Sequence, residues 1–364
     1  KEVTMKIGIL TWHKECNHGA VLQAYASQEM LKKLGANPVM LDYIANDNNM
    51  DNAFGKRLKR AIKRLKPDAL KVRKMLPEWN DEKVKKIADF RAEMFALGDM
   101  YSAEKGLDKV LIGSDMVFDF YEGYNPFMYG KNVNCDYIFA YAACFGYTTD
   151  ELFETYEHKD EIIAYIKKMK ALSYRDDNTG HLLKKYCGAN NAVKAIDPVM
   201  LYGFKQERKL WAKHNNRMPY MVIYSYTYNM DTPNEIRIIK KFAEDKGLKI
   251  VSVGYIHTWC DENVNASPME FIDLFENADY IVTDTFHGTV FSLTFSKQFA
   301  VVVRNNAFKI VDVLDSVGLY NRSKDPLEKQ FKESIDYNCV ETNIEKLRKR
   351  SFDYLKSQVA GDVQ

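Results

Sequence analysis

The residues best suited to chemistry lie in the segment Thr283-Asp-Thr-Phe-His-Gly-Thr289. His287 can donate, accept or shuttle a proton near neutral pH. The segment follows the apolar run Tyr280–Val282, which predicts a strand, and precedes a helix predicted after Gly288. Ligands bind at this edge of open α/β sheets, and a helix N-terminus suits an anion. We therefore expect His287 at the chemical centre, with Thr285 and Gly288 at the ligand, although a single histidine can also be a packed loop residue.

The first half of the chain holds an equivalent turn, Asn17-His-Gly-Ala-Val-Leu-Gln23. It follows a strand predicted for Lys6–Thr11, and its glycine and following helix can hold a ligand by the same physics. Asn17, His18 and Gly19 are therefore candidate ligand contacts, although His18 can equally be a loop residue. The pattern is not GxGxxG, so the dinucleotide-binding fingerprint is absent from this turn.

Polar residues also follow three other predicted strands: Ser114 and Asp115 after residues 109–112, Arg175 after residues 171–174, and Arg304 after residues 299–303. An aspartate at a strand end can bind a sugar hydroxyl or a cation, or it can cap a helix or turn. An arginine there can bind a carboxylate or phosphate through two parallel hydrogen bonds. Taken singly, a surface arginine more often forms an ion pair.

Other features exclude several classes of function. The chain has no zinc-ligand spacing, P-loop or GxSxG segment, so we expect no metal and no bound cofactor. A formal net charge of +2 over 364 residues gives no case for a nucleic-acid partner. The run Ile7–Leu10 is too short for a signal peptide, and no apolar run reaches the ~20 residues of a membrane span. These features predict a cytoplasmic protein.

Alternating strands and helices must position these residues. One series begins with the strand at Lys6, and a second begins with a strand predicted for Tyr220–Tyr224. Ser267-Pro-Met-Glu270 has the form of a capping box and predicts a helix start. Such alternation predicts parallel sheets, and 364 residues exceed one ordinary core. We therefore expect N-terminal and C-terminal Rossmann-like domains over residues 1–205 and 206–340, with a helix in residues 341–364 that packs back on the first domain.

A basic segment interrupts the first series between residues 46 and about 82. It is poor in strand residues, and we interpret it as a surface insertion with helical pieces. Its basic residues alternate with apolar ones: Arg57, Lys59, Arg60, Lys63, Arg64, Lys66, Lys71, Arg73 and Lys74. A solvated helix is one interpretation. The other is a patch for anionic lipid or a polyanionic acceptor, which predicts peripheral association with a membrane.

The motifs, in their order along the chain, resemble those of the polysaccharide pyruvyl transferase family. The matching segments run from about residue 6 to 322: Ile7–Leu10, Asn17–Tyr25, Leu34-Gly35, Gly113–Asp115, Tyr141–Gly146, Ser173–Arg175, Asp197-Pro198 and Thr283–Gly288. The resemblance implies an α/β fold with two Rossmann-like domains facing a cleft, as in the GT-B glycosyltransferases.

The resemblance also implies a reaction. It implies transfer of the pyruvyl group of phosphoenolpyruvate onto a pair of sugar hydroxyls, which gives a pyruvate ketal on a cell-surface polysaccharide or its precursor. The acceptor saccharide can be lipid-linked. His287 and Arg175 match the family's catalytic residues, and Lys309 best matches a basic residue downstream of the histidine, with Arg304 nearby.

The chain departs from the family pattern at two positions near Asp115. Met116 and Phe118 stand where glutamine and tryptophan are usual, so a polar amide and an indole N–H suited to sugar contacts are missing. Two alternatives stay open, the first because it shares the implied fold and the second because of these changes. One is a GT-B glycosyltransferase that uses a nucleotide sugar, and the other is a non-catalytic carbohydrate-binding relative.

Overall fold

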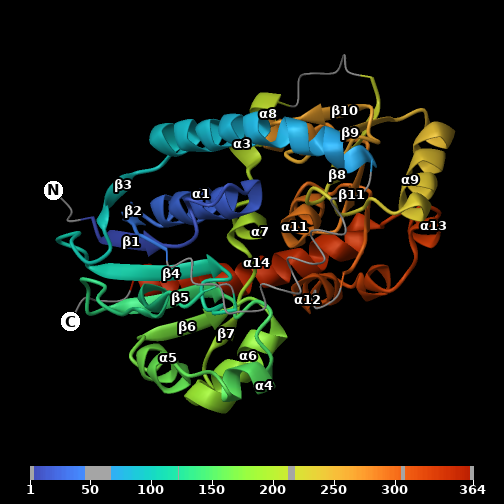
Figure 1. The fold of residues 1–364 in the computed structure, drawn as a ribbon. Helices are drawn as coiled ribbons and strands as arrows, with labels where there is room; N and C mark the ends of the chain where they lie inside the picture. The colour runs from blue at the N-terminus through green and yellow to red at the C-terminus, as the bar shows by residue number, and fades with distance from the viewer. Residues whose placement is uncertain (1–3, 46–66, 122, 212–217, 305–307, 361–364) are drawn as a thin grey trace.

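The computed structural model describes residues 4–45, 67–121, 123–211, 218–304 and 308–360 of the chain. These residues form two α/β domains side by side (Figure 1). One sheet has seven strands in the order β3-β2-β1-β4-β5-β6-β7, and the other has five in the order β10-β9-β8-β11-β12. Every strand pairing is parallel. The predicted fold class is therefore confirmed.

The first sheet is buried on both faces by helices, as parallel sheets are. Its strands are β1 (Lys6–Leu10), β2 (Asn37–Asp42), β3 (Leu97–Met100), β4 (Lys109–Asp115), β5 (Ile138–Ala143), β6 (Ala171–Tyr174) and β7 (Val193–Lys194). Its helices are α1 (His18–Lys33), α3 (Pro67–Met94), η1 (Pro126–Tyr129), α4 (Asp150–Glu154), α5 (Lys159–Ile166), α6 (Asp177–Cys187) and α7 (Pro198–Tyr202). Consequently every residue of β4, in the middle of the sheet, is buried except Asp115 at its end, which is partly exposed.

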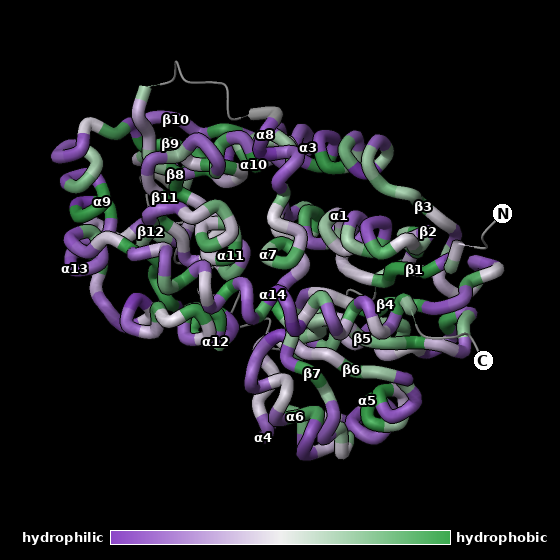
Figure 2. The backbone as a smooth tube through the Cα atoms, turned by 180° about the vertical axis from the view of Figure 1, so that it is seen from behind, coloured by the Kyte–Doolittle hydropathy of each residue, from purple (hydrophilic) through white to green (hydrophobic). Residues whose placement is uncertain are grey.

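The second sheet has the same architecture. Its strands are β8 (Tyr220–Tyr224), β9 (Lys249–Val253), β10 (Glu262–Val264), β11 (Tyr280–Thr283) and β12 (Phe299–Val301). Its helices are α8 (Lys205–Trp211), α9 (Pro233–Lys246), α10 (Pro268–Glu276), α11 (Phe286–Thr294), α12 (Phe308–Ser316), η2 (Tyr320–Ser323) and α13 (Leu327–Gln330). Hydrophobic and hydrophilic turns alternate along the outer helix α9 (Figure 2), which buries only its inner side.

One hydrophobic core runs through both domains. It includes Ile9 of β1, Val199 of α7, Val222 of β8 and Ile344 of the last helix, all of them buried. The short helix α7 packs against α1, α11 and α14 (Tyr337–Ala360). The two sheets are therefore joined by a shared apolar layer and not by a polar linker alone.

The last helix, α14, lies across the first domain (Figure 1). The Tyr354 hydroxyl donates to the Ala140 carbonyl at 2.8 Å, and the Lys109 ammonium donates to the Gln358 carbonyl at 2.6 Å. The Ser351 hydroxyl accepts from the backbone N–H of Ile196 at 2.9 Å. The helix thus leaves the second domain and packs on the strands of the first.

The described part of the basic segment is helical, as the interpretation with helical pieces expects, but its helix extends beyond residue 82. Residues 46–66 of the segment lie outside the described residues, but residues 67–82 form the first part of α3, which continues to Met94. Beyond residue 82 this helix reaches the second domain: Lys83 donates to the Gly254 carbonyl at 2.9 Å, and Lys86 donates to the Asn265 carbonyl at 2.6 Å. The helix therefore spans both domains, and an insertion ending at residue 82 does not describe it.

The membrane prediction gains no direct support from the described residues. Of the basic run, only Lys71, Arg73 and Lys74 are described, and all three are exposed on α3. None of the described helices is long and apolar enough to cross a bilayer. Peripheral contact with anionic lipid stays a prediction.

Candidate functional site

The strands of both sheets have their carboxyl ends at the domain interface, and polar side chains lie there. Asp115 ends β4, Arg175 follows β6, and Asp197 follows β7 in the first domain. From the second domain, α11 starts at Phe286, whose ring lies 4.1 Å from the Arg175 guanidinium carbon. The predicted helix after Gly288 thus begins earlier, and His287 lies in its first turn.

Arg175 is buried between two carboxylates. Its Nη1 donates to Asp197 Oδ2 at 2.7 Å and its Nη2 donates to Asp115 Oδ1 at 2.9 Å, while its own side chain is 3% exposed. Burial by itself would raise the pKa of Asp115, but Arg175, His287 and Lys309 together hold that pKa below its ordinary value. Burial also opposes ionisation of Asp197, and His287 and Arg175 lower its pKa. Both carboxylates are therefore ionised near neutral pH.

His287 faces this charged group from the second domain. Thr285 caps its helix by accepting from the Gly288 N–H at 2.9 Å, which fixes the first turn. The Nε2 atom of His287 lies 3.6 Å from Asp197 Oδ2. This nitrogen is buried and has no hydrogen-bond partner among the described residues. An imidazole in this position can move a proton, with a carboxylate close enough to stabilise its charged form.

Two glycines allow this close packing. A Cβ atom at Gly19, in the first turn of α1, would overlap the imidazole of His287, and one at Gly288 would overlap the Thr283 hydroxyl. The N-terminus of α1 therefore packs directly against the His287 ring. The structure shows both glycines making room for neighbouring side chains, and their predicted contact with a ligand stays a prediction.

Lys309 brings a cation to the same place. Its Nζ lies 2.9 Å from Met116 Sδ, and 5.7 and 5.6 Å from the ring centres of Tyr147 and Phe286. In the parts of the chain that the structure describes, no carboxylate lies within ion-pair distance of this ammonium. An ammonium that faces a site without a counter-ion is suited to an anionic ligand.

Two predicted contact residues point into the protein interior. Ser114 is fully buried, and its hydroxyl donates to the Ala142 carbonyl at 3.0 Å. His18 is also fully buried, with Nε2 2.7 Å from the Ala266 carbonyl oxygen and its ring stacked on Phe271. Burial, reinforced by Lys83, lowers the pKa of His18 to about 3, so it is neutral. The Ser114 hydroxyl thus joins two strands of the first sheet, and the His18 ring joins the two domains.

Two others lie at the edge of the site. Asn17 caps α1 through its Oδ1 and donates from Nδ2 to the Tyr226 hydroxyl, 3.3 Å away in the second domain. Arg304 pairs with Glu235 at 2.8 Å and with Asp284 at 3.1 Å. Its charge is therefore balanced within the second domain, whereas Lys309 has no carboxylate in ion-pair contact among the described residues.

Sequence reasoning did not select Asp197 as a site residue. It accepts from the Val199 N–H at 3.0 Å and caps α7, the role that an acid before a proline usually has. In the structure Asp197 follows β7, which pairs with β6, so it reaches the same edge of the sheet as Arg175. Met116 borders the site, whereas Phe118 packs on Tyr129 in the core, with ring centres 5.6 Å apart.

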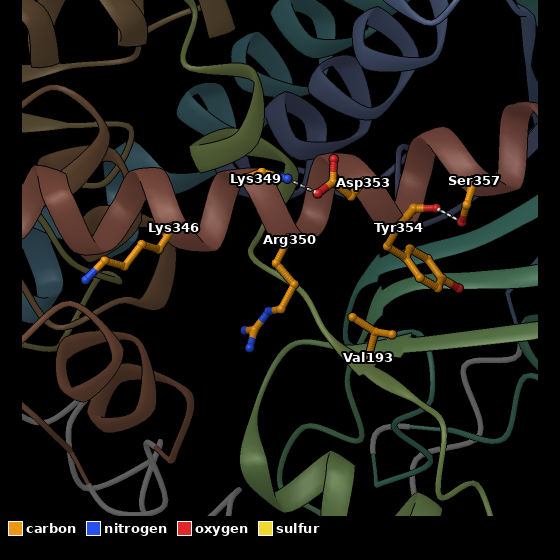
Figure 3. A pocket seen from close by; sticks show the side chains of 7 residues that line it. All are labelled: Val193, Lys346, Lys349, Arg350, Asp353, Tyr354 and Ser357. Carbon is orange, nitrogen blue, oxygen red and sulfur yellow. Dashed lines mark hydrogen bonds and ion pairs between the residues drawn. The ribbon is translucent and has the colours of Figure 1, made fainter.

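Two pockets of very different volume lie in and near the site. The pocket lined by Arg175, Asp197, Phe286 and Lys309 holds only about 20 Å³, close to the space of one water molecule. A wider depression of about 560 Å³ lies between α14 and β7 (Figure 3), lined by Val193, Lys346, Lys349, Arg350, Asp353, Tyr354 and Ser357. Arg350 lines both pockets.

Among the described residues, no group of His, Cys, Asp and Glu is arranged to hold a metal ion.

Several solved structures resemble the chain over most of its length. They include UDP-GlcNAc 2-epimerase of Methanocaldococcus jannaschii (13% identity, 91% of this chain and 98% of that one, TM-score 0.44). Others are UGT89C1 of Arabidopsis thaliana with UDP-L-rhamnose (10%, 98% and 98%, 0.49) and MnaA of S. aureus with UDP (11%, 93% and 94%, 0.47). No protein of curated function matches the sequence.

The sequence itself matches a family. The family model described as polysaccharide pyruvyl transferase covers residues 17–306, which is most of the chain. This range includes Asp115, Arg175, Asp197 and His287, which the fold brings together at the domain interface. The chain belongs to the polysaccharide pyruvyl transferase family.

Proposed function

We propose that this protein transfers the pyruvyl group of phosphoenolpyruvate to a pair of saccharide hydroxyls, forming a pyruvate ketal. The observation that carries the proposal is the unpaired Lys309 ammonium beside the buried group of Asp115, Arg175, Asp197 and His287. Family membership supports the reaction class. To this reaction class the proposal adds phosphoenolpyruvate as the donor and a pyruvate ketal as the product.

The reaction requires both charge stabilisation and proton transfer. Two acceptor oxygens form bonds to C2 of the donor, whose bond to the phosphate oxygen breaks, and one hydroxyl proton ends on C3 while the other leaves with phosphate. His287 is the group placed to move a proton during these steps. Lys309 is placed to bind the donor's phosphate or carboxylate.

Arg175 has a different part in this proposal. Both of its Nη atoms are engaged by carboxylates, so it holds Asp115 and Asp197 in place and does not by itself bind the donor. The pocket behind it is too small for phosphoenolpyruvate. The donor therefore approaches from the side of Lys309 and Tyr147, where the domains face each other.

A binding measurement tests the donor. Lys309→Met keeps most of the stem but removes the charge, so we expect phosphoenolpyruvate to bind about ten- to a hundredfold more weakly than to the wild type, as loss of a charge-assisted contact implies. Calorimetric titration of both proteins measures this difference in affinity. Lys324→Met is the control, because Lys324 is an exposed residue at the C-terminal end of η2. Tight binding of a nucleotide sugar together with none of phosphoenolpyruvate would contradict the proposed donor.

A further inference from the structure

Tyr226 is a large aromatic side chain left exposed beside the site. It follows β8, and 47% of its surface is accessible. Its hydroxyl accepts from Asn17 Nδ2 at 3.3 Å, and Asn17 Oδ1 accepts from the Gly19 N–H at 2.8 Å. Gly19 packs against His287. The exposed ring is thus two residues away from the proposed proton-transfer group.

The ring is held in a fixed orientation. Tyr255 packs edge-on against it with ring centres 5.1 Å apart, and Tyr255 is supported by Tyr224 at 5.6 Å and by the Lys83 ammonium 4.1 Å from its ring centre. Together with the bond to Asn17, these contacts anchor Tyr226 from behind. Its accessible surface therefore needs no rearrangement before a ligand packs on it.

Polar groups border the same space. Desolvation raises the pKa of the Tyr226 phenol, and the charges of Tyr147 and Asp115 raise it further. Asp115 shares the Arg175 guanidinium with Asp197, which lies 3.6 Å from His287, so Asp115 belongs to the same site. The Asp115 side chain is 15% exposed, and only its Oδ1 is taken by Arg175. A free carboxylate oxygen in the same site as an exposed ring offers a hydroxyl acceptor in addition to an apolar face. That combination suits a molecule with both hydroxyls and a C–H face.

We infer that Tyr226 is the stacking platform of the acceptor subsite, on which one pyranose ring of the saccharide packs with a hydroxyl directed to Asp115. A pyranose presents axial C–H groups on a face and hydroxyls at its edge, so it matches an anchored aromatic ring with a carboxylate in the same site. The inference rests on the proposed function for the identity of the acceptor as a saccharide. It adds a residue from the second domain to a site whose acidic groups come from the first.

Saturation-transfer NMR with a panel of methyl pyranosides tests the platform without any turnover. We expect at least one pyranoside to bind the wild type, with saturation concentrated on the C–H protons of one ring face. Tyr226→Ala should weaken that binding about tenfold, as loss of an aromatic anchor does. Tyr226→Phe keeps the ring and loses one partly exposed hydrogen bond, so its affinity should fall about threefold or less.

Tyr320→Ala is the matched control. Tyr320 is 40% exposed in η2, and the neighbouring Arg322 donates to the carbonyl of Phe299, the first residue of β12. Tyr320 therefore lies near the amino ends of the strands of the second sheet, whereas the site lies at their carboxyl ends. The Tyr320→Ala variant should bind like the wild type. Unchanged affinity in Tyr226→Ala, an equal loss in Tyr320→Ala, or a wild type that binds no member of the panel would overturn the inference.

The outcome is separable from that of the proposed reaction. If pyranosides bind as expected but phosphoenolpyruvate is not consumed with any of them, the proposed donor fails and the platform stands. If phosphoenolpyruvate is consumed and Tyr226→Ala leaves the acceptor KM unchanged, the platform fails and the reaction stands.

Discussion

Arg175 and His287 approach the same oxygen, Oδ2 of Asp197, at 2.7 and 3.6 Å. The arginine comes from the first domain and the histidine from the second, so one carboxylate fixes the position of groups from both. Asp115 completes the balance of charge around the guanidinium. A change at Arg175 affects the ionisation of both carboxylates, because the charge of its buried guanidinium lowers the pKa of Asp115 and of Asp197.

Replacing Arg175 should therefore affect stability as well as catalysis. Arg175→Ala leaves two buried carboxylates without their cation, and we expect the free energy of unfolding to fall by about 3–5 kcal/mol. Urea denaturation measures this. Arg237→Ala is the control, because Arg237 is exposed on α9 and its guanidinium donates to the exposed Asn234, so its loss should cost ~1 kcal/mol or less. Equal stabilities of the two variants would show that Arg175 is not held as described.

The residues at the strand ends could be predicted from sequence, and their partners could not. His287, Asp115 and Arg175 each follow an apolar run, so the alternation of strands and helices places them at the carboxyl edge. That His18 is buried depends on Phe271 and Ala266, which are about 250 residues away in the sequence. Local pattern cannot specify such a contact.

At the scale of elements, α14 positions the turn that carries Asp197. The Ser351 hydroxyl accepts from the Ile196 N–H, one residue before Asp197, while Arg348 donates to the carbonyl of Met200, within α7, at 2.7 Å. A helix from the end of the chain thus holds both sides of α7. The turn that carries Asp197 therefore depends on a residue 155 positions beyond Ile196 in the sequence.

Removing the Ser351 hydroxyl tests this support. Ser351→Ala leaves the buried N–H of Ile196 without a partner, so we expect the free energy of unfolding to fall by about 1–3 kcal/mol. Ser357→Ala, on the same helix, removes an exposed hydroxyl that donates to the Tyr354 carbonyl and accepts from Gln358 Nε2, and it should change stability by less than about 0.5 kcal/mol. Chemical denaturation of the two variants makes the comparison, and equal losses would refute the assigned support.

The main elements of the second domain follow directly from sequence, whereas α3 does not. The capping box at Ser267 and the strand at Tyr220 are local signals, and both occur in the structure where predicted. The helix α3 contains Pro77 and many lysines, which indicate a solvated surface segment. Its fixed position comes from Lys83 and Lys86, whose acceptors belong to the other domain, and local periodicity carries no information about them.

At the scale of the whole molecule, the ionised carboxylates make stability depend on pH. The pKa of Asp115 is lower in the folded protein than the ordinary value of about 3.9. Folding therefore gains free energy from this group above that value, and the gain is lost as the pH falls through the interval between the unfolded and folded pKa values. The pKa of Asp197 is shifted in the same direction and adds to the effect.

Asp115→Asn should reduce this dependence. Below about pH 4, the free energy of unfolding of the wild type should fall more steeply than that of the variant, which lacks one of the two shifted carboxylates. Urea denaturation at a series of pH values gives both slopes. Asp245→Asn, at an exposed position of α9, serves as the control and should follow the wild type. Parallel curves for Asp115→Asn and the wild type would show that the Arg175 pair does not persist in solution.

The central claim is that His287 moves a proton in pyruvyl transfer from phosphoenolpyruvate, and acceptor-dependent release of phosphate measures it most directly. With a saccharide acceptor, the wild type should release phosphate and yield a product with the mass of a pyruvate ketal. His287→Ala should fold normally by circular dichroism and turn over about 10²–10⁴ times more slowly. A folded His287→Ala variant that releases phosphate and forms the ketal at the wild-type rate would contradict the account.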